Sequence, residues 1–60
     1  MSNYIMQIFD DITVALKEAE WLAETEGKPF ALLARPNQQV AVCPLIDAEG
    51  HVLEVCLPLL

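Results

Sequence analysis

Residues 27–34 read Gly27-Lys28-Pro29-Phe30-Ala31-Leu32-Leu33-Ala34, and the chain changes its hydrophobic pattern across this stretch. Glycine is common just past the end of a helix, because it adopts the left-handed backbone conformation without strain. A proline two residues later cannot continue the helix. The short apolar run that follows is typical of a strand. The stretch therefore predicts a helix that ends before Gly27 and a strand that begins after Pro29.

Residues 12–24 have the period of an amphipathic helix. Apolar side chains recur there at the spacing i, i+3, i+4, i+7, which places them on one helical face. The members of this stripe are Ile12, Ala15, Leu16, Ala19, Leu22 and Ala23. Asp10 and Asp11 precede it, and aspartate is a favoured helix N-cap. We expect a helix over at least residues 12–24 whose small alanines let it lie close to a sheet.

Three strand candidates follow, at residues 30–34, 40–46 and 51–57. Pro36-Asn37 and the segment 47–50, which ends in glycine, separate them as turns. Pro44 has no N–H to donate and so marks a bulge or a strand end. The length allows one domain. The sequence predicts a single α+β domain over residues 1–60, in which one helix packs on a small antiparallel meander sheet.

The N-terminal segment allows two interpretations. Residues 4–9 are rich in strand formers and run into the Asp10-Asp11 cap, which favours a strand and the order β-α-β-β-β. Ile5, Ile8 and Phe9 also continue the helical stripe in phase, which would give a longer helix and the order α-β-β-β. We favour the strand.

Both faces of the expected sheet are apolar. Residues that lie opposite one another on neighbouring strands share a face. We assume that the last turn places Ile46 opposite His51 and that Arg35 pairs with Gln39. Ala31, Leu33, Ala41, Cys43, Leu45, Val52, Glu54 and Cys56 then form one face. Phe30, Leu32, Ala34, Val40, Val42, Ile46, Leu53, Val55 and Leu57 form the other, which we expect to meet the helix. A slip of one residue would exchange partners between the faces.

The chain thus has more apolar surface than one helix can cover. It is 55% hydrophobic, and a domain of 60 residues is marginally stable alone. We expect a homodimer or larger oligomer, with the N-terminal segment or residues 58–60 folding over the face as the competing alternative. The sheet residues that we expect to bind a partner are Leu33, Cys43, Leu45, Val52, Glu54 and Cys56.

Trp21 is a second candidate contact, because it falls roughly opposite the middle of the helical stripe, with Val14 beside it. Tryptophan is enriched among the residues that dominate protein interfaces. The alternative is an indole that lies along its own helix under Lys17 and Glu18.

The formal net charge is −6, from nine acidic and three basic residues. This balance excludes the basic surface that nucleic-acid binding needs. An acidic helix face keeps an apolar protein in solution, but it can also imitate nucleic acid or dock on a basic protein.

The sequence shows no pattern of a catalytic, metal or cofactor site. The spacing of Cys43, His51 and Cys56 matches no zinc pattern, so we interpret the cysteines as packed thiols and expect no metal, no cofactor and no enzymatic activity. The start lacks a basic signal region, and no apolar run approaches the about 18 residues of a membrane span. We expect a cytoplasmic protein with reduced thiols and no membrane contact.

Two functions fit these sequence features. The favoured one is a small non-enzymatic interaction protein that self-associates and docks on a partner protein. The alternative is an acidic nucleic-acid mimic that inhibits a nucleic-acid-binding protein. Apolar docking is nearly insensitive to salt, whereas mimicry weakens steeply as salt screens it.

Overall fold

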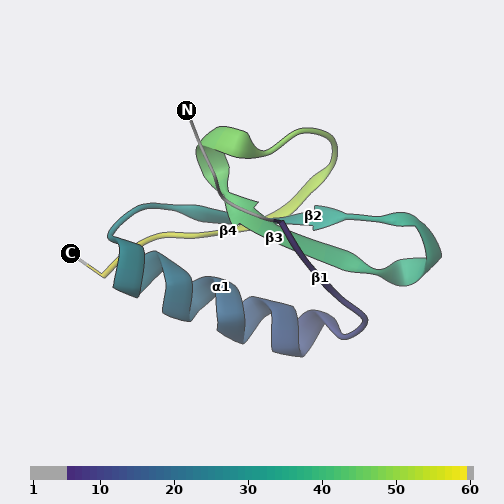
Figure 1. The fold of residues 1–60 in the computed structure, drawn as a ribbon, viewed down its shortest axis with the longest axis horizontal. Coiled ribbons are helices and arrows are strands. Elements are labelled where there is room, and N and C mark those ends of the chain that lie inside the picture. Colours follow the sequence, from purple (N-terminus) through teal and green to yellow (C-terminus); the bar gives the residue numbers. More distant parts are fainter. Residues whose placement is uncertain (1–5, 60) are drawn as a thin grey trace.

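The computed structural model describes residues 6–59 as one helix and four strands (Figure 1). In chain order the elements are β1 (Gln7–Phe9), α1 (Ile12–Glu26), β2 (Phe30–Ala34), β3 (Val40–Pro44) and β4 (Val52–Cys56), with short 3-10 turns at Pro36–Gln38 and Leu45–Asp47. The expected α+β class and the order β-α-β-β-β are confirmed. The longer N-terminal helix is wrong, since residues 7–9 form a strand and α1 begins at Ile12; Tyr4 and Ile5 lie outside the described residues.

Helix α1 begins and ends where its capping residues predict. The Thr13 N–H donates to Asp11 Oδ1 over 2.8 Å, which satisfies one of the free amides of the first turn. Gly27 has a φ of 71° and donates its N–H to the Ala23 carbonyl over 2.9 Å. A left-handed residue at this position is common and favours glycine. The predicted helix over residues 12–24 is therefore confirmed, with two further residues at its end.

The sheet has the strand order β1-β3-β2-β4, and each neighbouring pair is antiparallel. Strands β2 and β3 form a hairpin, in which Ala34 pairs with Val40 and Phe30 with Pro44. Strand β4 pairs with β2 rather than β3. The expected meander hairpin, with Ile46 opposite His51, is therefore wrong, although the fold class stands.

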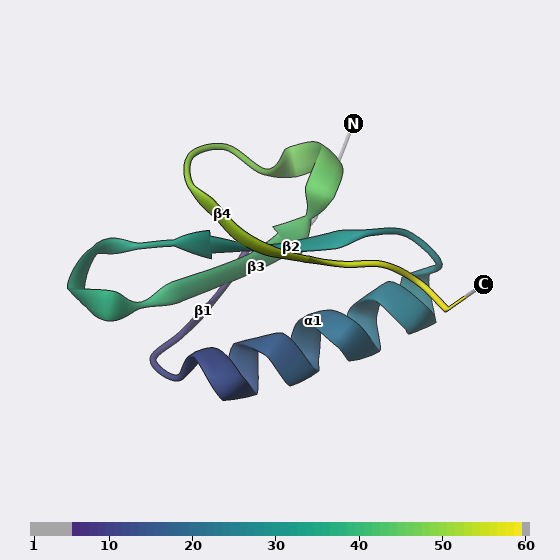
Figure 2. The same cartoon turned by 180° about the vertical axis from the view of Figure 1, so that it is seen from behind.

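The physical reason lies at Pro44. β3 ends there, and Leu45–Asp47 form a tight turn in which the Ala48 N–H donates to the Leu45 carbonyl over 3.0 Å. The connection then crosses one face of the sheet and returns beside the far edge of β2 (Figures 1 and 2). There the His51 carbonyl accepts a hydrogen bond from the Ala34 N–H over 2.9 Å, which sets the start of β4.

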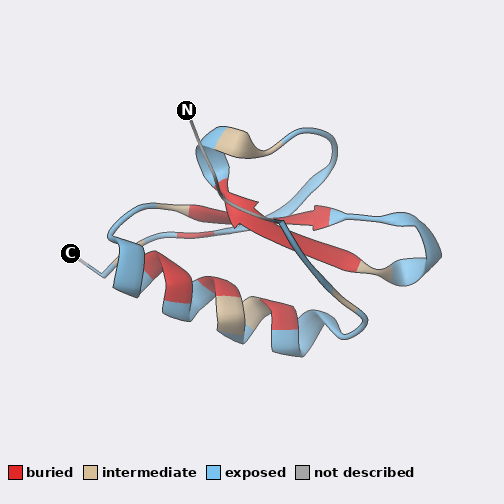
Figure 3. Ribbon diagram, in the orientation of Figure 1, coloured by how far each residue is buried: buried red, intermediate tan, exposed pale blue. Residues whose placement is uncertain are grey.

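Buried residues occur along α1 and in the sheet strands (Figure 3), and their side chains form clusters on both faces of the sheet. Those between the sheet and α1 are Ala15, Ala19, Leu22, Ala23, Phe30, Leu32, Val40, Val42 and Cys56. The opposite face has a smaller cluster formed by Ala31, Leu33, Ala41 and Cys43, against which Ala48 of the β3–β4 connection packs. Leu33 is 3% exposed and Cys43 2%. The expectation that this part of the face lies open is therefore wrong, because the crossing connection contributes to its cover.

The pairing of β2 with β4 contains a register shift. Leu32 lies opposite Glu54, but the next residue, Leu33, lies opposite Val52, so Leu53 has no opposite residue of its own. Such a bulge changes which residues share a face. Glu54 therefore lies on the helix side with Leu32, and Val52 lies on the opposite side with Leu33.

The same register corrects the expected faces of β4. Cys56 lies opposite Phe30 on the helix side, and Val55 lies opposite Ala31 on the other side. The sequence interpretation placed Cys56 and Glu54 away from the helix and Val55 toward it, and all three are reversed. The expected side of Val52 is confirmed.

Candidate functional site

The residues that the sequence singles out for partner binding do not form one surface. Leu33, Cys43 and Cys56 are buried, so these three side chains present little area to a partner. Leu45 and Val52 are exposed, and so is Glu54. The other two candidates, on α1, are also exposed: Val14 at 51% and Trp21 at 59%.

Much apolar surface nevertheless stays uncovered. Twelve large apolar side chains among residues 6–59 are exposed: Met6, Ile8, Ile12, Val14, Trp21, Leu45, Ile46, Val52, Leu53, Val55, Leu57 and Leu59. Single exposed apolar residues are ordinary, whereas a contiguous group marks an interaction site. Five of the twelve belong to β4 and the three residues that follow it. This edge of the sheet therefore has the largest group of exposed apolar side chains.

Strand β4 lies at the end of the sheet, and in the described part of the chain it pairs with β2 alone. An edge strand presents backbone N–H and C=O groups on its outer side, which can pair with another chain. Proteins commonly block such edges with charged side chains. Within Val52–Cys56, Glu54 is the one charged residue.

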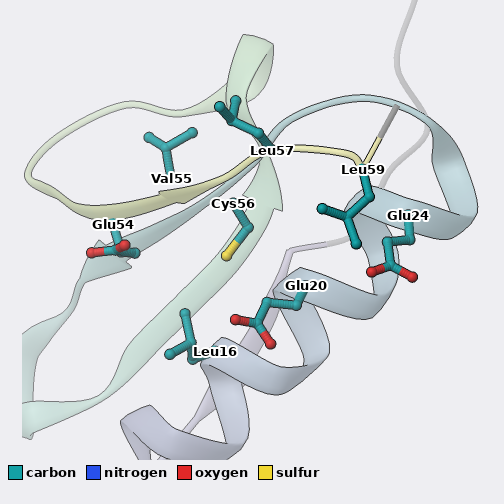
Figure 4. Close-up of a pocket in the computed structure, with 8 residues that line it drawn as sticks. All are labelled: Leu16, Glu20, Glu24, Glu54, Val55, Cys56, Leu57 and Leu59. Carbon is teal, nitrogen blue, oxygen red and sulfur yellow. The ribbon is translucent and has the colours of Figure 1, made fainter.

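A groove of about 450 Å³ separates α1 from β4 (Figure 4). Its lining residues are Leu16, Glu20, Glu24, Glu54, Val55, Cys56, Leu57 and Leu59. The helical members follow one another at i, i+4, so they lie on one helical face. Figure 4 shows Cys56 pointing from β4 toward α1, whereas Val55 and Leu57 lie on the side of β4 away from the helix. The groove exists because α1 packs mainly on β2 and β3.

The groove is acidic. Glu20, Glu24 and Glu54 line it, and none of its lining residues is basic. Burial raises the pKa of the Cys56 thiol, and the carboxylates of Glu20 and Glu54 raise it further. This second effect is the expected action of nearby negative charge on a group that ionises to an anion. The interior of the groove therefore has a negative potential.

Both thiols remain protonated at neutral pH. Burial also raises the pKa of the Cys43 thiol, with a further contribution from the Asp47 carboxylate. The thiolate is the reactive form of cysteine, so neither residue has the environment of a nucleophile. Cys43 and Cys56 also lie on opposite faces of the sheet, and both are free.

A second hollow of about 420 Å³ lies at the end of the sheet where β3 meets the α1–β2 turn. It is lined by Lys28, Pro29, Pro44, Leu45 and Ile46. The Leu45 N–H donates to the Pro29 carbonyl over 3.0 Å and joins the two turns. Ile46 is 87% exposed at this end, so the hollow adds an apolar patch but no convergent polar group.

Residues 6–59 contain neither a metal cluster nor a membrane-spanning helix. No three His, Cys, Asp or Glu side chains in this range are grouped so that they could hold a metal ion. No helix in the same range is long and apolar enough to cross a membrane.

The sequence interpretation missed part of the groove, namely Leu16, Glu20, Glu24, Val55, Leu57 and Leu59. A signal for the first three was present, because they repeat every four residues along α1. Nothing local indicates that β4 would lie beside them, since that depends on its pairing with β2.

Comparison with protein-family models, with curated proteins and with solved structures finds no match to this chain.

Proposed function

We propose that this chain is a small acidic, non-enzymatic protein–protein interaction protein that self-associates and docks on a partner protein. The observation that carries the proposal is the apolar edge of the sheet at β4. Reduced, buried thiols are consistent with a place in the cytoplasm.

The side of β4 away from α1 is the surface for self-association. We call it the outer β4 face and define it by Val52, Val55 and Leu57. Val52 and Val55 lie opposite Leu33 and Ala31 of the smaller buried cluster, and all three residues of the outer β4 face are exposed. Burying apolar area contributes about 25 cal/mol per Å² to stability. A second copy that covers this face would extend the smaller cluster, and the buried area would stabilise both copies.

Symmetry favours this arrangement. A two-fold dimer brings the same patch of each copy together, so an apolar patch meets an apolar patch. Glu20 and Glu24 belong to α1, and Glu54 lies on the helix side of the sheet. These three carboxylates are therefore outside such a contact. The net charge of −6 on each copy opposes association over most of the surface and restricts it to an uncharged face.

Sedimentation equilibrium at micromolar concentration tests the proposal. The expected result is a species of twice the 6.7 kDa of the chain. The variant Val52→Glu should sediment as a monomer, because it places a carboxylate in the interface of each copy.

The matched control is Val14→Glu, which adds the same charge to an exposed position on α1 and should leave the dimer intact. Circular dichroism of each variant establishes that the fold is retained. A wild-type monomer, or equal dissociation of both variants, would contradict the proposal.

A further inference from the structure

We infer that the acidic groove between α1 and β4 binds an extended, positively charged segment of a partner protein, which adds to the sheet beside β4. The inference rests on the proposed docking function and names the chemistry of the partner. It concerns the helix side of β4 and its free edge. Val55 and Leu57 border the groove as well as the outer β4 face, whereas Val52 belongs to the outer β4 face alone.

The shape of the groove leaves room for an added strand. α1 covers β2 and β3, whereas the helix side of β4 is left partly open. Leu16 and Leu59 border the opening and Cys56 points into it (Figure 4). A strand beside β4 would project every second side chain into this space, because side chains alternate across a sheet.

The charge of the groove favours a basic occupant. Glu20 and Glu24 line the groove from the helix, and Glu54 lines it from β4 (Figure 4). No lining residue is basic, and the thiol of Cys56 experiences the negative potential of Glu20 and Glu54. Lysine or arginine side chains would neutralise these carboxylates. A second copy of this chain is a poor occupant, because it carries a net charge of −6 itself.

The spacing of the helix carboxylates matches the repeat of a strand. Glu20 and Glu24 are four residues apart, which is about 6 Å along a helix at about 1.5 Å per residue. Residues i and i+2 of a strand are about 6.6 Å apart. Two basic residues that alternate with apolar ones along an extended segment therefore match the two glutamates. Recognition of this type uses backbone hydrogen bonds for affinity and alternate side chains for specificity.

The test uses the full chain labelled with ¹⁵N and an acetylated, amidated peptide of alternating lysine and valine, with three lysines. The expected result is a set of amide shift changes in β4 and along the Leu16–Glu20–Glu24 face of α1, together with slower amide exchange in β4. A peptide with glutamate in place of each lysine should cause no change.

Two double variants separate the groove from the overall charge. Glu20→Gln with Glu24→Gln should weaken peptide binding about fivefold, since each lost carboxylate removes an ion pair with a lysine. Glu26→Gln with Glu49→Gln removes the same charge from exposed positions outside the groove and should weaken binding far less.

Three results would overturn the inference: no binding of the lysine peptide, equal weakening by both double variants, or shift changes that map to β1 or to Trp21. Unchanged amide exchange in β4 on binding would also contradict strand addition. The proposed function is judged separately by the sedimentation of Val52→Glu, because Val52 does not line the groove.

Discussion

Glu54 of β4 lies opposite Leu32 of β2, on the side of the sheet that faces α1. This single pairing brings a carboxylate to the groove that Glu20 and Glu24 line from the helix. It follows from the bulge at Leu53, which reverses the faces of the residues after it. Without the bulge, Glu54 would lie on the outer β4 face. That face would then be charged, and the groove would keep only the carboxylates of Glu20 and Glu24.

The tip of the β2–β3 hairpin stores backbone strain. Asn37 has a φ of 61° and Gln38 a φ of 63°. Asparagine tolerates the left-handed region, whereas glutamine is rarely found there. We expect Gln38→Gly to raise the free energy of unfolding by about 0.5–1 kcal/mol, because glycine adopts this conformation without strain. Urea unfolding measures the change.

The control for this prediction is Arg35→Gly. Arg35 has a φ of −129°, which any residue adopts. Glycine there should destabilise the chain, because it adds freedom to the unfolded state and relieves no strain. If both variants shift the urea midpoint in the same direction, strain at Gln38 is not the cause.

The N-cap of α1 is a second determinant of stability. Asp11 accepts a hydrogen bond from the Thr13 N–H over 2.8 Å. We expect Asp11→Ala to lower the free energy of unfolding by about 1 kcal/mol. Asp11→Asn retains the cap oxygen and should recover most of the loss. A full loss in both variants would indicate that the negative charge, and not the capping hydrogen bond, is what matters.

Much of the fold follows from local sequence signals. The caps at Asp11 and Gly27 gave the helix bounds, and alternation along β2 and β3 placed Phe30 and Val42 toward the helix, as the structure has them. These features depend on neighbouring residues alone.

The position of β4 depends on contacts that are distant in sequence. A turn at 47–50 suggests a hairpin, but Pro44 ends β3 early and the connection crosses to the far edge of β2. The bulge at Leu53 then shifts the faces once more. For these two reasons the local sequence signals predict the wrong face for Glu54 and Cys56 and do not predict the groove.

The thiols make stability sensitive to alkaline pH. Burial raises the pKa of Cys43 and of Cys56 above the ordinary value of 9.0. In the unfolded chain the thiols ionise first, so unfolding is favoured as the pH rises above 9, and the contribution is fully present below that pH. We expect the melting temperature to fall from about pH 9 upward.

The comparison for this prediction is the double variant Cys43→Ala with Cys56→Ala. It should be less stable at neutral pH, because two buried side chains become smaller, but its melting temperature should fall less steeply above pH 9. An identical slope in the wild type and the double variant would show that other groups cause the alkaline loss.

Association of two copies through the outer β4 face is tested most directly by an isotope-filtered NOE experiment on a mixture of labelled and unlabelled chains. The predicted result is a set of intermolecular NOEs that involve the methyl groups of Val52, Val55 and Leu57. The absence of intermolecular NOEs at micromolar to millimolar concentration, or NOEs confined to Val14 and Trp21 on the helix, would contradict this mode of association.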